Sequence, residues 1–172
     1  MELINLETWV IADTHFFDRS PELINLRPTG WQETLINNWK HQVLPDETIL
    51  HLGDLSLCSG DELRGLIPCL PGRITLLRGN HDKFPSEFYR GLGIQIAVRA
   101  IDQLLEYNQT EYWLRFSHEP EPELMPRMLN IHGHTHGLPT PFTGKPGYID
   151  ASPEALNYHP CRLREILDKE IN

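Results

Sequence analysis

Cysteine is scarce in this sequence. Three cysteines occur among the 172 residues, and no two of them form a CxxC pair. They are Cys58, Cys69 and Cys161. An odd number of widely spaced cysteines argues against a disulfide framework and against a thiolate zinc site. We therefore expect these side chains to act as small apolar residues of the interior.

Long apolar runs are also missing. No stretch approaches the ~20 apolar residues that a membrane helix needs. The start, MELINLETWV, has neither the basic block nor the apolar block of a secretory signal. These absences predict a cytoplasmic protein with no membrane partner.

Basic residues are outnumbered by acidic ones. There are 15 Lys and Arg against 24 Asp and Glu, for a formal net charge of -9. Such a charge argues against broad electrostatic binding to nucleic acid or to anionic membranes, but it leaves room for a local cationic site such as a metal centre. The hydrophobic content of 40% and the charged content of 23% are ordinary for a folded chain. The length fits a single domain over residues 1–172.

One local sequence pattern occurs five times in the chain. A short apolar run, rich in β-branched or aromatic residues, is followed at once by a polar cluster with His, Asp or Asn. The five stretches are TWVIADTH, TILHLGDL, RITLLRGNHD, EYWLRFSHEP and MLNIHGHTHG. Each run predicts a strand, and ligands of open α/β sheets bind beyond the carboxyl ends of the strands. Five strands would thus deliver polar side chains to one edge.

Helical patterns separate the first of these strands. In GWQETLINNWKHQV the apolar residues recur four apart, which predicts an amphipathic helix over residues 31–43. GDELRGLIPCL and PSEFYRGLG predict shorter helices, and CRLREILDKEIN predicts a helix that packs on the core. The pattern changes at Gly93, because GIQIAVRAI, QLLEY and TEYWLRFS are strand-like, with a hairpin turn at Asn108-Gln109. GLPTPFTGKPGY predicts a surface loop near the site. This order predicts the α/β class, with one mixed sheet or two sheets packed face to face.

Seven side chains in the polar clusters offer nitrogen or oxygen to a metal, and none offers sulfur. They are Asp13, His15, Asp54, Asn80, His118, His134 and His136. The set suits Mn, Fe, Zn, Ni or Co and is too rich in imidazole for a site of Mg or Ca alone. Seven ligands fit two ions that share a carboxylate, about 3.5–4 Å apart, as in centres that activate water for in-line phosphoryl displacement. Two divalent ions against two carboxylates leave such a site cationic, which favours a phosphate ester.

The last polar cluster lies in the stretch LNIHGHTHGL, residues 129–138, which contains three histidines at alternate positions. If this stretch is extended, alternate residues share a face, so that His132, His134 and His136 would point to the same side.

The order of the polar blocks resembles a known family. D-T-H at 13–15, G-D at 53–54, G-N-H-D at 79–82, the lone His118 and G-H-T-H at 133–136 are similar to the five-block signature of the calcineurin-like metallophosphoesterase superfamily. The likeness runs from residue 9 to about residue 137. The stretch NNWKHQVLPDETILHLGDL also resembles the small stand-alone bacterial and phage members, which have no cap domain. The resemblance implies a metallophosphoesterase-type β-sandwich of mixed sheets flanked by α-helices.

The resemblance also implies which residues hold metal. The first ion would be held by Asp13, His15 and His136, the shared carboxylate would be Asp54, and the second ion would be held by Asn80, His118 and His134. The cofactors would be two divalent ions, with manganese the first choice and Fe, Zn, Ni or Co as alternatives. Of the catalytic residues, His81 would face the scissile oxygen, and Asp82 would orient the His81 ring.

Four neighbours of these blocks have structural interpretations as well. His51 and His132 are expected to be hydrogen-bonded structural residues rather than ligands. Gly53 and Gly79 are either turn glycines or places where the backbone approaches a metal or phosphate closely.

Substrate contacts are harder to assign from the sequence. Arg78 either forms a surface ion pair or contacts phosphate, and Arg19 and Arg27 are candidate substrate contacts. Asp18 stands where similar small phosphoesterases often carry a second histidine, a departure that bears on substrate selection.

These features predict a dinuclear metal-dependent phosphoesterase in which a metal-bridging hydroxide attacks phosphorus. A short chain without an evident cap favours an open site and therefore phosphodiesters. The alternatives are a phosphomonoesterase or protein phosphatase on the same site, because selectivity lies in the loops, and a non-catalytic metal-binding scaffold of the same fold. The net charge disfavours a nucleic-acid-binding module, although a nuclease acting through the metal site is compatible with it.

Overall fold

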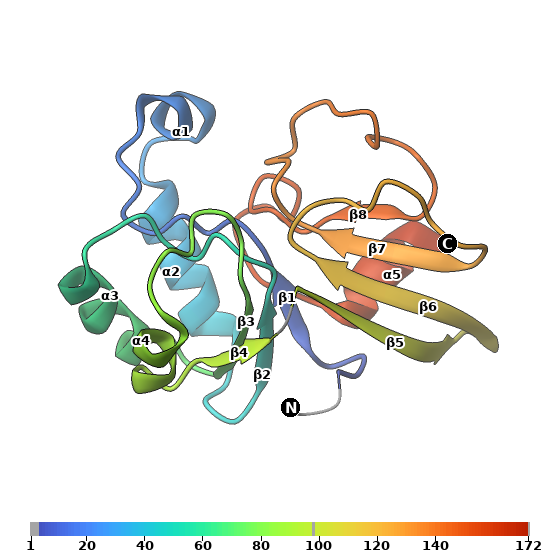
Figure 1. Ribbon diagram of the computed structural model, residues 1–172, viewed down its shortest axis with the longest axis horizontal. Helices are drawn as coiled ribbons and strands as arrows, with labels where there is room; N and C mark the ends of the chain where they lie inside the picture. The colour runs from blue at the N-terminus through green and yellow to red at the C-terminus, as the bar shows by residue number, and fades with distance from the viewer. Residues whose placement is uncertain (1–3, 98, 172) are drawn as a thin grey trace.

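Two β-sheets form the frame of the molecule (Figure 1). The computed structural model describes residues 4–97 and 99–171. The first sheet has the strand order β4-β3-β2-β1-β9 and the second has the order β5-β6-β7-β8. The strands are β1 (Trp9–Ile11), β2 (Thr48–His51), β3 (Arg73–Leu77), β4 (Gln95–Ala97), β5 (Ala100–Tyr107), β6 (Thr110–Ser117), β7 (Met128–His132), β8 (Tyr148–Asp150) and β9 (Cys161–Arg162). Both sheets contain parallel and antiparallel pairs, so the α/β class with two mixed sheets is confirmed.

Parallel pairing in the first sheet explains why helices separate its strands. β1, β2, β3 and β4 pair in parallel, whereas β9 runs antiparallel to β1. Parallel neighbours need a long crossover, usually a helix. The helices are α1 (Pro21–Leu26), α2 (Trp31–Gln42), α3 (Gly60–Leu66), the short 3-10 helix η1 (Ile67–Cys69), α4 (Ser86–Gly91) and α5 (Leu163–Ile171). The carboxyl ends of β1, β2 and β3 therefore lie at one edge of the sheet.

The first sheet is buried on both faces because it lies between two hydrophobic clusters. Val10 contributes to a cluster that also contains Phe116 of the second sheet and Leu167 of α5. Ile11, its neighbour in β1, contributes instead to a cluster with Trp39 of α2. Alternate residues of one strand thus fill different cores, as the pleat requires.

The helices α2 and α3 form where the sequence pattern predicts them. Trp31, Leu35 and Trp39 make the buried stripe of α2, as predicted. α3 begins with a capping box, in which the Ser59 side chain accepts from the Glu62 N–H and the Glu62 carboxylate accepts from the Ser59 N–H.

Several short elements differ from the expectations. Residues 93–101 do not form one strand, because β4 ends before Val98, which lies outside the described residues, and β5 begins at Ala100. The last helix begins at Leu163, since the two residues before it form β9. α1, β8 and β9 were not predicted because six, three and two residues are too few to show a period.

The predicted hairpin and the cysteines can also be compared with the structure. Asn108 and Gln109 form the turn between β5 and β6, both with positive φ, 49° and 61°, as a two-residue hairpin requires. Cys161 is buried, but Cys58 is only half-buried and Cys69 is exposed, so the interior placement is right for one cysteine and wrong for Cys69. Among the described residues no helix is long and apolar enough to cross a membrane.

Trp39 offers a test of the cluster beneath α2. Its side chain is fully buried, and its indole N–H donates to the Pro71 carbonyl at 2.9 Å. We expect Trp39→Ala to lower the free energy of unfolding by about 3–5 kcal/mol, because it leaves a large cavity. Trp113→Ala is the matched control, since Trp113 is 43% exposed, and should cost about 1 kcal/mol or less. Urea unfolding measures both, and equal losses would contradict the assignment of the core.

Candidate metal centre

The candidate ligands lie on loops that leave the strand ends in a strained backbone conformation. Eleven described non-glycine residues have positive φ, and five of these are candidate ligands. Those five are Asp13, His15, Asp54, His134 and His136, with φ of 48°, 44°, 54°, 69° and 52°. Left-handed conformations are costly for such residues and cluster at functional sites, where they aim side chains that a strand could not.

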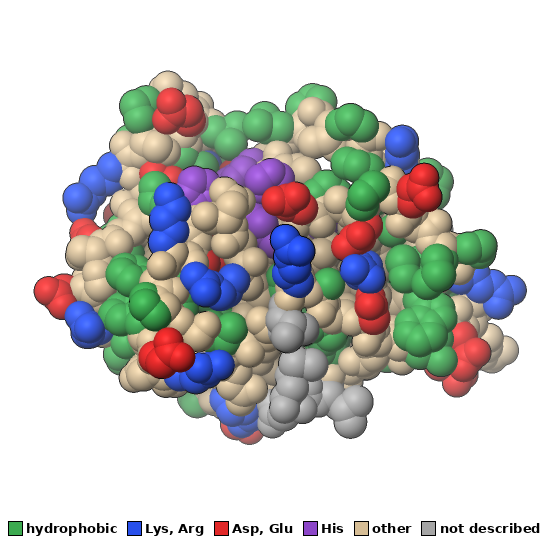
Figure 2. Space-filling model, in the orientation of Figure 1, with side chains coloured by type: hydrophobic (Ala, Val, Ile, Leu, Met, Phe, Trp, Pro, Cys, Tyr) green, Lys and Arg blue, Asp and Glu red, His purple; other side chains and the backbone are tan. Residues whose placement is uncertain are grey.

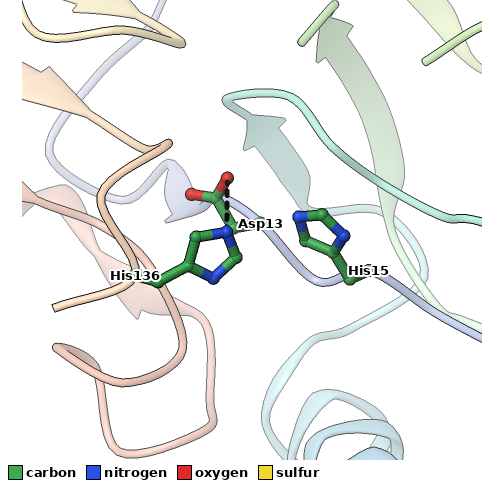
Figure 3. Close-up of side chains that lie close together, drawn as sticks. All are labelled: Asp13, His15 and His136. Atoms are coloured by element: carbon green, nitrogen blue, oxygen red, sulfur yellow. Dashed lines mark ion pairs between the residues drawn. The ribbon is translucent and has the colours of Figure 1, made fainter. Parts of the chain in front are cut away.

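Two groups of potential ligands result. Asp13, His15 and His136 form the first group (Figure 3). Asp54, His118 and His134 form the second. In each group the ligand atoms all lie within 4.8 Å of one another. Loops distant in the sequence therefore bring these side chains together in two sets, each large enough to hold one ion.

The dense histidine stretch is split between the two groups. β7 ends at His132, and the residues after it turn away from the strand axis. His136 joins the first group and His134 joins the second. The idea that three histidines share one face of an extended strand is therefore wrong beyond His132, because the positive φ of the two later histidines breaks the alternation.

Asp54 lies between the two groups. Its Oδ2 atom is 3.5 Å from His15 Nε2 and 3.4 Å from His118 Nε2. Its other oxygen, Oδ1, accepts a hydrogen bond of 2.8 Å from the His81 N–H. One oxygen of this carboxylate is thus fixed by the backbone and the other faces both sets of imidazoles.

Asn80 belongs with the second group, although it is neither acidic nor an imidazole. Its Oδ1 is 2.9 Å from His118 Nε2 and 3.1 Å from His134 Nδ1. The His118 Nδ1–H donates to the Leu52 carbonyl at 2.9 Å, so that Nε2 is the atom turned to the site. A second ring nitrogen fixed by a carbonyl is typical of metal-binding histidines.

Two buried atoms of the first group have no hydrogen-bond partner among the described residues. They are Asp13 Oδ1 and His15 Nε2. Buried polar atoms are rarely left unpaired in folded proteins, because each loses its hydration without compensation. A carboxylate oxygen and an imidazole nitrogen that lie together with no hydrogen-bond donor between them can both offer lone pairs to a divalent cation. The residues present therefore fit a metal.

The ionisation of the site is set by burial and by mutual charge. Burial raises the pKa of Asp13 to about 7. Burial acts in the same direction on Asp54, but the imidazoles of His118 and His15, with Nε2 atoms 3.4 and 3.5 Å from its Oδ2, outweigh it and hold the pKa of Asp54 well below its usual range. For His118, burial lowers the pKa, yet the hydrogen bond to Asp54 and the charge of Asp13 raise it to about 9. The carboxylates thus attract positive charge, which a bound cation would supply directly.

Glycines allow the loops to approach these carboxylates. A Cβ on Gly79 would lie 2.2 Å from Asp54 Oδ1, and one on Gly133 would lie 2.3 Å from Asp13 Oδ2. Gly53 has φ of +100°, and a Cβ there would lie 2.6 Å from His118 Nδ1. Close packing against ligand side chains, rather than turn formation alone, is what requires glycine at these positions.

His81 lies at the edge of the first group, but its expected partner does not reach it. The rings of His81 and His15 meet edge to face, with centroids 5.3 Å apart. His81 Nδ1 is buried and has no hydrogen-bond partner among the described residues. Asp82 instead accepts from the backbone N–H groups of Asp54, Leu55 and Gly79, at 2.8, 3.0 and 2.8 Å. The prediction that Asp82 orients the His81 ring is therefore wrong, since its two oxygens are already committed to the loop backbone.

Two carboxylates that the sequence did not single out as ligand supports contact the first group. Asp18 Oδ2 is 3.2 Å from His15 Nδ1, and Glu154 Oε1 is 3.7 Å from His136 Nδ1. A carboxylate on the far nitrogen fixes the tautomer of a ligand histidine. The supporting role of Asp18 could have been predicted from its position three residues after His15. Glu154 has no local signal, since it lies far along the chain.

Arg27 is buried behind the first group and cannot contact substrate. Its guanidinium donates to the carbonyls of Asp13 and Thr14, at 2.7 and 3.2 Å, and to Glu154 Oε1 at 2.6 Å. It also stacks over the Trp31 ring, 4.3 Å from the ring centroid. Its expected role as a substrate contact is therefore wrong, because it ties the β1 loop to Glu154.

The other arginines remain near the site. Arg78 donates to the carbonyls of Asp82 and Phe84, which closes the loop that carries His81. It therefore forms no surface ion pair with a described carboxylate. Arg19 is exposed and pairs with Glu62 at 2.8 Å.

The structural interpretation of two histidines is supported. His51 is fully buried, with Nε2 2.9 Å from Thr14 Oγ1 and Nδ1 accepting from the Gly53 N–H at 3.2 Å. Burial lowers the pKa of His51 to about 3, so that it is neutral. His132 is buried, and its Nδ1–H donates to the Gly133 carbonyl at 2.9 Å. Both rings support the loops that carry the candidate ligands.

Comparison with known proteins covers most of the chain. A family model described as calcineurin-like phosphoesterase matches residues 6–148. The chain is 32% identical over 170 residues to the uncharacterized protein MJ1445 of Methanocaldococcus jannaschii, and the match covers 90% of this chain and 86% of that protein. It is similar to the crystal structure of AQ665 from Aquifex aeolicus, a protein of unknown function, with a TM-score of 0.70, 26% identity and coverage of 94% and 97% of the two chains. An archaeal phosphodiesterase is more distant, with a TM-score of 0.46, 19% identity and coverage of 85% and 82%.

The position of Arg27 can be tested by stability. We expect Arg27→Ala to lower the free energy of unfolding by about 3–5 kcal/mol, because it removes the buried guanidinium that pairs with Glu154 and donates to the carbonyls of Asp13 and Thr14. Arg19→Ala is the control, since the Arg19 side chain is 79% exposed, and should change stability by about 0.5 kcal/mol or less. Both are measured by urea unfolding of the metal-free protein. An Arg27→Ala variant as stable as Arg19→Ala would contradict the buried role.

Proposed function

The chain belongs to the calcineurin-like phosphoesterase family, and on that premise we propose that it is a two-metal phosphoesterase that prefers phosphodiesters. In this proposal Asp13, His15 and His136 hold one divalent ion and Asn80, His118 and His134 hold the other, with Asp54 shared between them. The family uses such centres on phosphate esters. All seven of these ligands come from a single chain.

The position of Asp54 is the observation that carries the proposal. Its Oδ2 lies within 3.5 Å of an imidazole from each group. A mononuclear second site would use Asp54 together with His118 and His134, but it would not require the approach of Asp54 Oδ2 to His15 in the first group. Two cations that shared this carboxylate would offset the cost of burying its negative charge, because the carboxylate oxygens would donate lone pairs to them.

The donor set narrows the choice of ion. All seven donors are nitrogen or oxygen, which suits Mn, Fe, Zn, Ni or Co, and among these ions we propose manganese first. When bound, two divalent ions would supply a nucleophile from water at neutral pH and would offset charge on the phosphate oxygens. The chain itself contributes two carboxylate charges, from Asp13 and Asp54, so the loaded centre keeps a net positive charge for an anionic ester.

We propose that His81 acts on the leaving group. It is half-buried beside His15, and its backbone N–H is fixed on Asp54. We assign to its ring the transfer of a proton to the departing oxygen, or a hydrogen bond to it. Asp82 contributes by holding the loop on which His81 stands, through the N–H groups of Asp54 and Gly79.

Cavities on both sides of the site favour a diester over a monoester. One cavity of about 430 Å³ is lined by His15, His81 and His136. Another, of about 510 Å³, is lined by Asn80 and His118. A phosphodiester carries an organic group on each side of phosphorus, whereas a monoester would fill one cavity only. A monoesterase or protein phosphatase on the same residues is the second candidate, and a scaffold without turnover is the third.

The deciding experiment combines metal analysis with a substrate screen. Purified protein should contain up to two transition-metal ions per chain, and the metal-loaded protein should hydrolyse bis(4-nitrophenyl) phosphate faster than 4-nitrophenyl phosphate. Faster hydrolysis of the monoester would favour the second candidate. Bound metal with no turnover of either ester across Mn, Ni and Co would favour the scaffold.

The shared role of Asp54 predicts a double loss. Asp54→Ala should remove both ions, with a fall in metal affinity beyond the roughly 10–100-fold that loss of a supporting residue causes. Metal content by mass spectrometry of the dialysed protein is the measurement. Asp61→Ala is the control, because the Asp61 side chain is 95% exposed and lies outside the two ligand groups. A variant at Asp54 that keeps two ions would refute the shared carboxylate.

The role of His81 predicts a loss of rate without loss of metal. His81→Ala should keep the metal content of the wild type and lower kcat by about 10²–10⁴-fold, as expected for removal of a general acid. The loss should shrink for an ester whose leaving group has a low pKa, since such a group departs without a proton. His41→Ala, on the exposed face of α2, should leave kcat unchanged. Wild-type kcat in His81→Ala would remove this residue from the mechanism.

A further inference from the structure

Two projecting segments rise on either side of the histidines. They are α1 and the loop between β7 and β8, and both extend beyond the edge of the sheets (Figure 1). In the space-filling view, hydrophobic side chains gather on both projections, with the imidazoles between them (Figure 2). The cavity of about 430 Å³ lies here. It is lined by His15, Asp18, Ser20, Glu22, Leu23, Leu26, Leu57, His81, His136 and Leu138.

The leucines of this cavity are unusually placed for a polar site. Leu26 is 38% exposed and Leu138 is 49% exposed, whereas Leu23 is buried and Leu57 is half-buried. They come from three separate parts of the chain and converge beside the same imidazoles. Apolar surface left in water is unfavourable, and a cluster of it next to polar groups marks a surface that is covered when a ligand binds.

The charge of the lining limits what can cover these leucines. Apart from the histidines, the charged residues among the lining are Asp18 and Glu22, and no Lys or Arg is present. Asp18 is held by His15, at 3.2 Å. A second phosphate or another anionic group would therefore be repelled from this cavity, while an uncharged apolar group would not.

His81 connects this cavity to the proposed reaction. A neighbouring cavity of about 670 Å³ is also lined by His81 and Leu57. The apolar wall thus begins at the imidazole that we place beside the leaving oxygen. An uncharged organic group attached to phosphorus on that side would favour the leucine-lined cavity, because Arg19, Glu62 and Lys83 make the lining of the neighbouring cavity charged.

We propose that the cavity formed by Leu23, Leu26, Leu57 and Leu138 binds an uncharged apolar or aromatic group of the phosphate ester. We call it the leucine pocket. This inference rests on the proposed function, because the metal centre must hold the phosphate. It adds the substrate class, which is an ester whose organic group on the His81 side is apolar and carries no second phosphate.

Binding of two phosphonates to the manganese-loaded protein tests the pocket without any turnover. Methylphosphonate and phenylphosphonate carry the same anionic head, and only the second can fill an apolar pocket. Isothermal titration should show phenylphosphonate binding about tenfold more tightly, in line with burial of one small apolar group. In the Leu26→Ser, Leu138→Ser double variant this ratio should fall to about one, with the affinity for methylphosphonate unchanged.

The controls separate failure of the pocket from failure of the proposed function. Leu44→Ser, Leu104→Ser removes two leucines that are 58% and 45% exposed elsewhere, and should keep the tenfold ratio. The single variants Leu26→Ser and Leu138→Ser should each give a partial loss, which keeps the test valid if the double variant misfolds. Equal affinity of the wild type for both phosphonates would overturn the pocket and leave the metal centre standing. No binding of either phosphonate to metal-loaded protein would overturn the proposed function and, with it, the pocket.

Discussion

The structure depends on carboxylates and imidazoles being held close together inside the protein, with few donors to compensate them. Asp54 is 1% exposed and faces an imidazole from each group, and Asp13 Oδ1 is buried without a partner among the described residues. Acceptors in such a place repel one another, so the side chains cannot hold the arrangement themselves. The backbone holds it instead. The N–H of His81 fixes one oxygen of Asp54, and the N–H of His134 fixes Asp13 Oδ2 at 2.7 Å.

This backbone scaffold is itself fixed by polar groups that do not face the site. Asp82 gathers N–H groups from the loops after β2 and β3, and Arg27 gathers carbonyls from the loop after β1. Asp150 does the same for the histidine loop, accepting from the Gly137 N–H and the Thr135 hydroxyl. Residues with positive φ leave the regular hydrogen-bond pattern of a strand, so their loops contain backbone N–H and C=O groups without strand partners. These side chains form hydrogen bonds with such groups. These hydrogen bonds thus offset the conformational free-energy cost of the strained loops close to the strained residues.

The sequence predicted the parts of this arrangement that are local. Each apolar run followed by a polar cluster could be recognised as a strand and its terminal loop, because alternation and ligand residues lie within ten positions. The contacts between loops have no such local pattern. Glu154 pairs with Arg27 across 127 positions, and neither residue has a neighbour that reveals the contact. The family resemblance implied that Asp82 orients the His81 ring, whereas the oxygens of Asp82 accept from backbone N–H groups and His81 Nδ1 has no hydrogen-bond partner among the described residues.

The charge distribution explains how an acidic chain can suit an anionic substrate. The net charge of -9 gives no long-range attraction for a polyanion, and Asp18 and Glu22 make one side of the site acidic as well. Bound ions would add positive charge at the centre itself, where their field is strong only at short range because salt screens it. Arg78, Arg99 and Arg115 line the cavity on the Asn80 side, so the acidic wall is restricted to the leucine pocket. A phosphate ester with one negative charge and an apolar group would be attracted electrostatically by the ions and would bury its apolar group in the leucine pocket. A second phosphate on the organic group would be repelled from the leucine pocket by Asp18 and Glu22, so the acidic lining on that side would select for an ester whose organic group is uncharged.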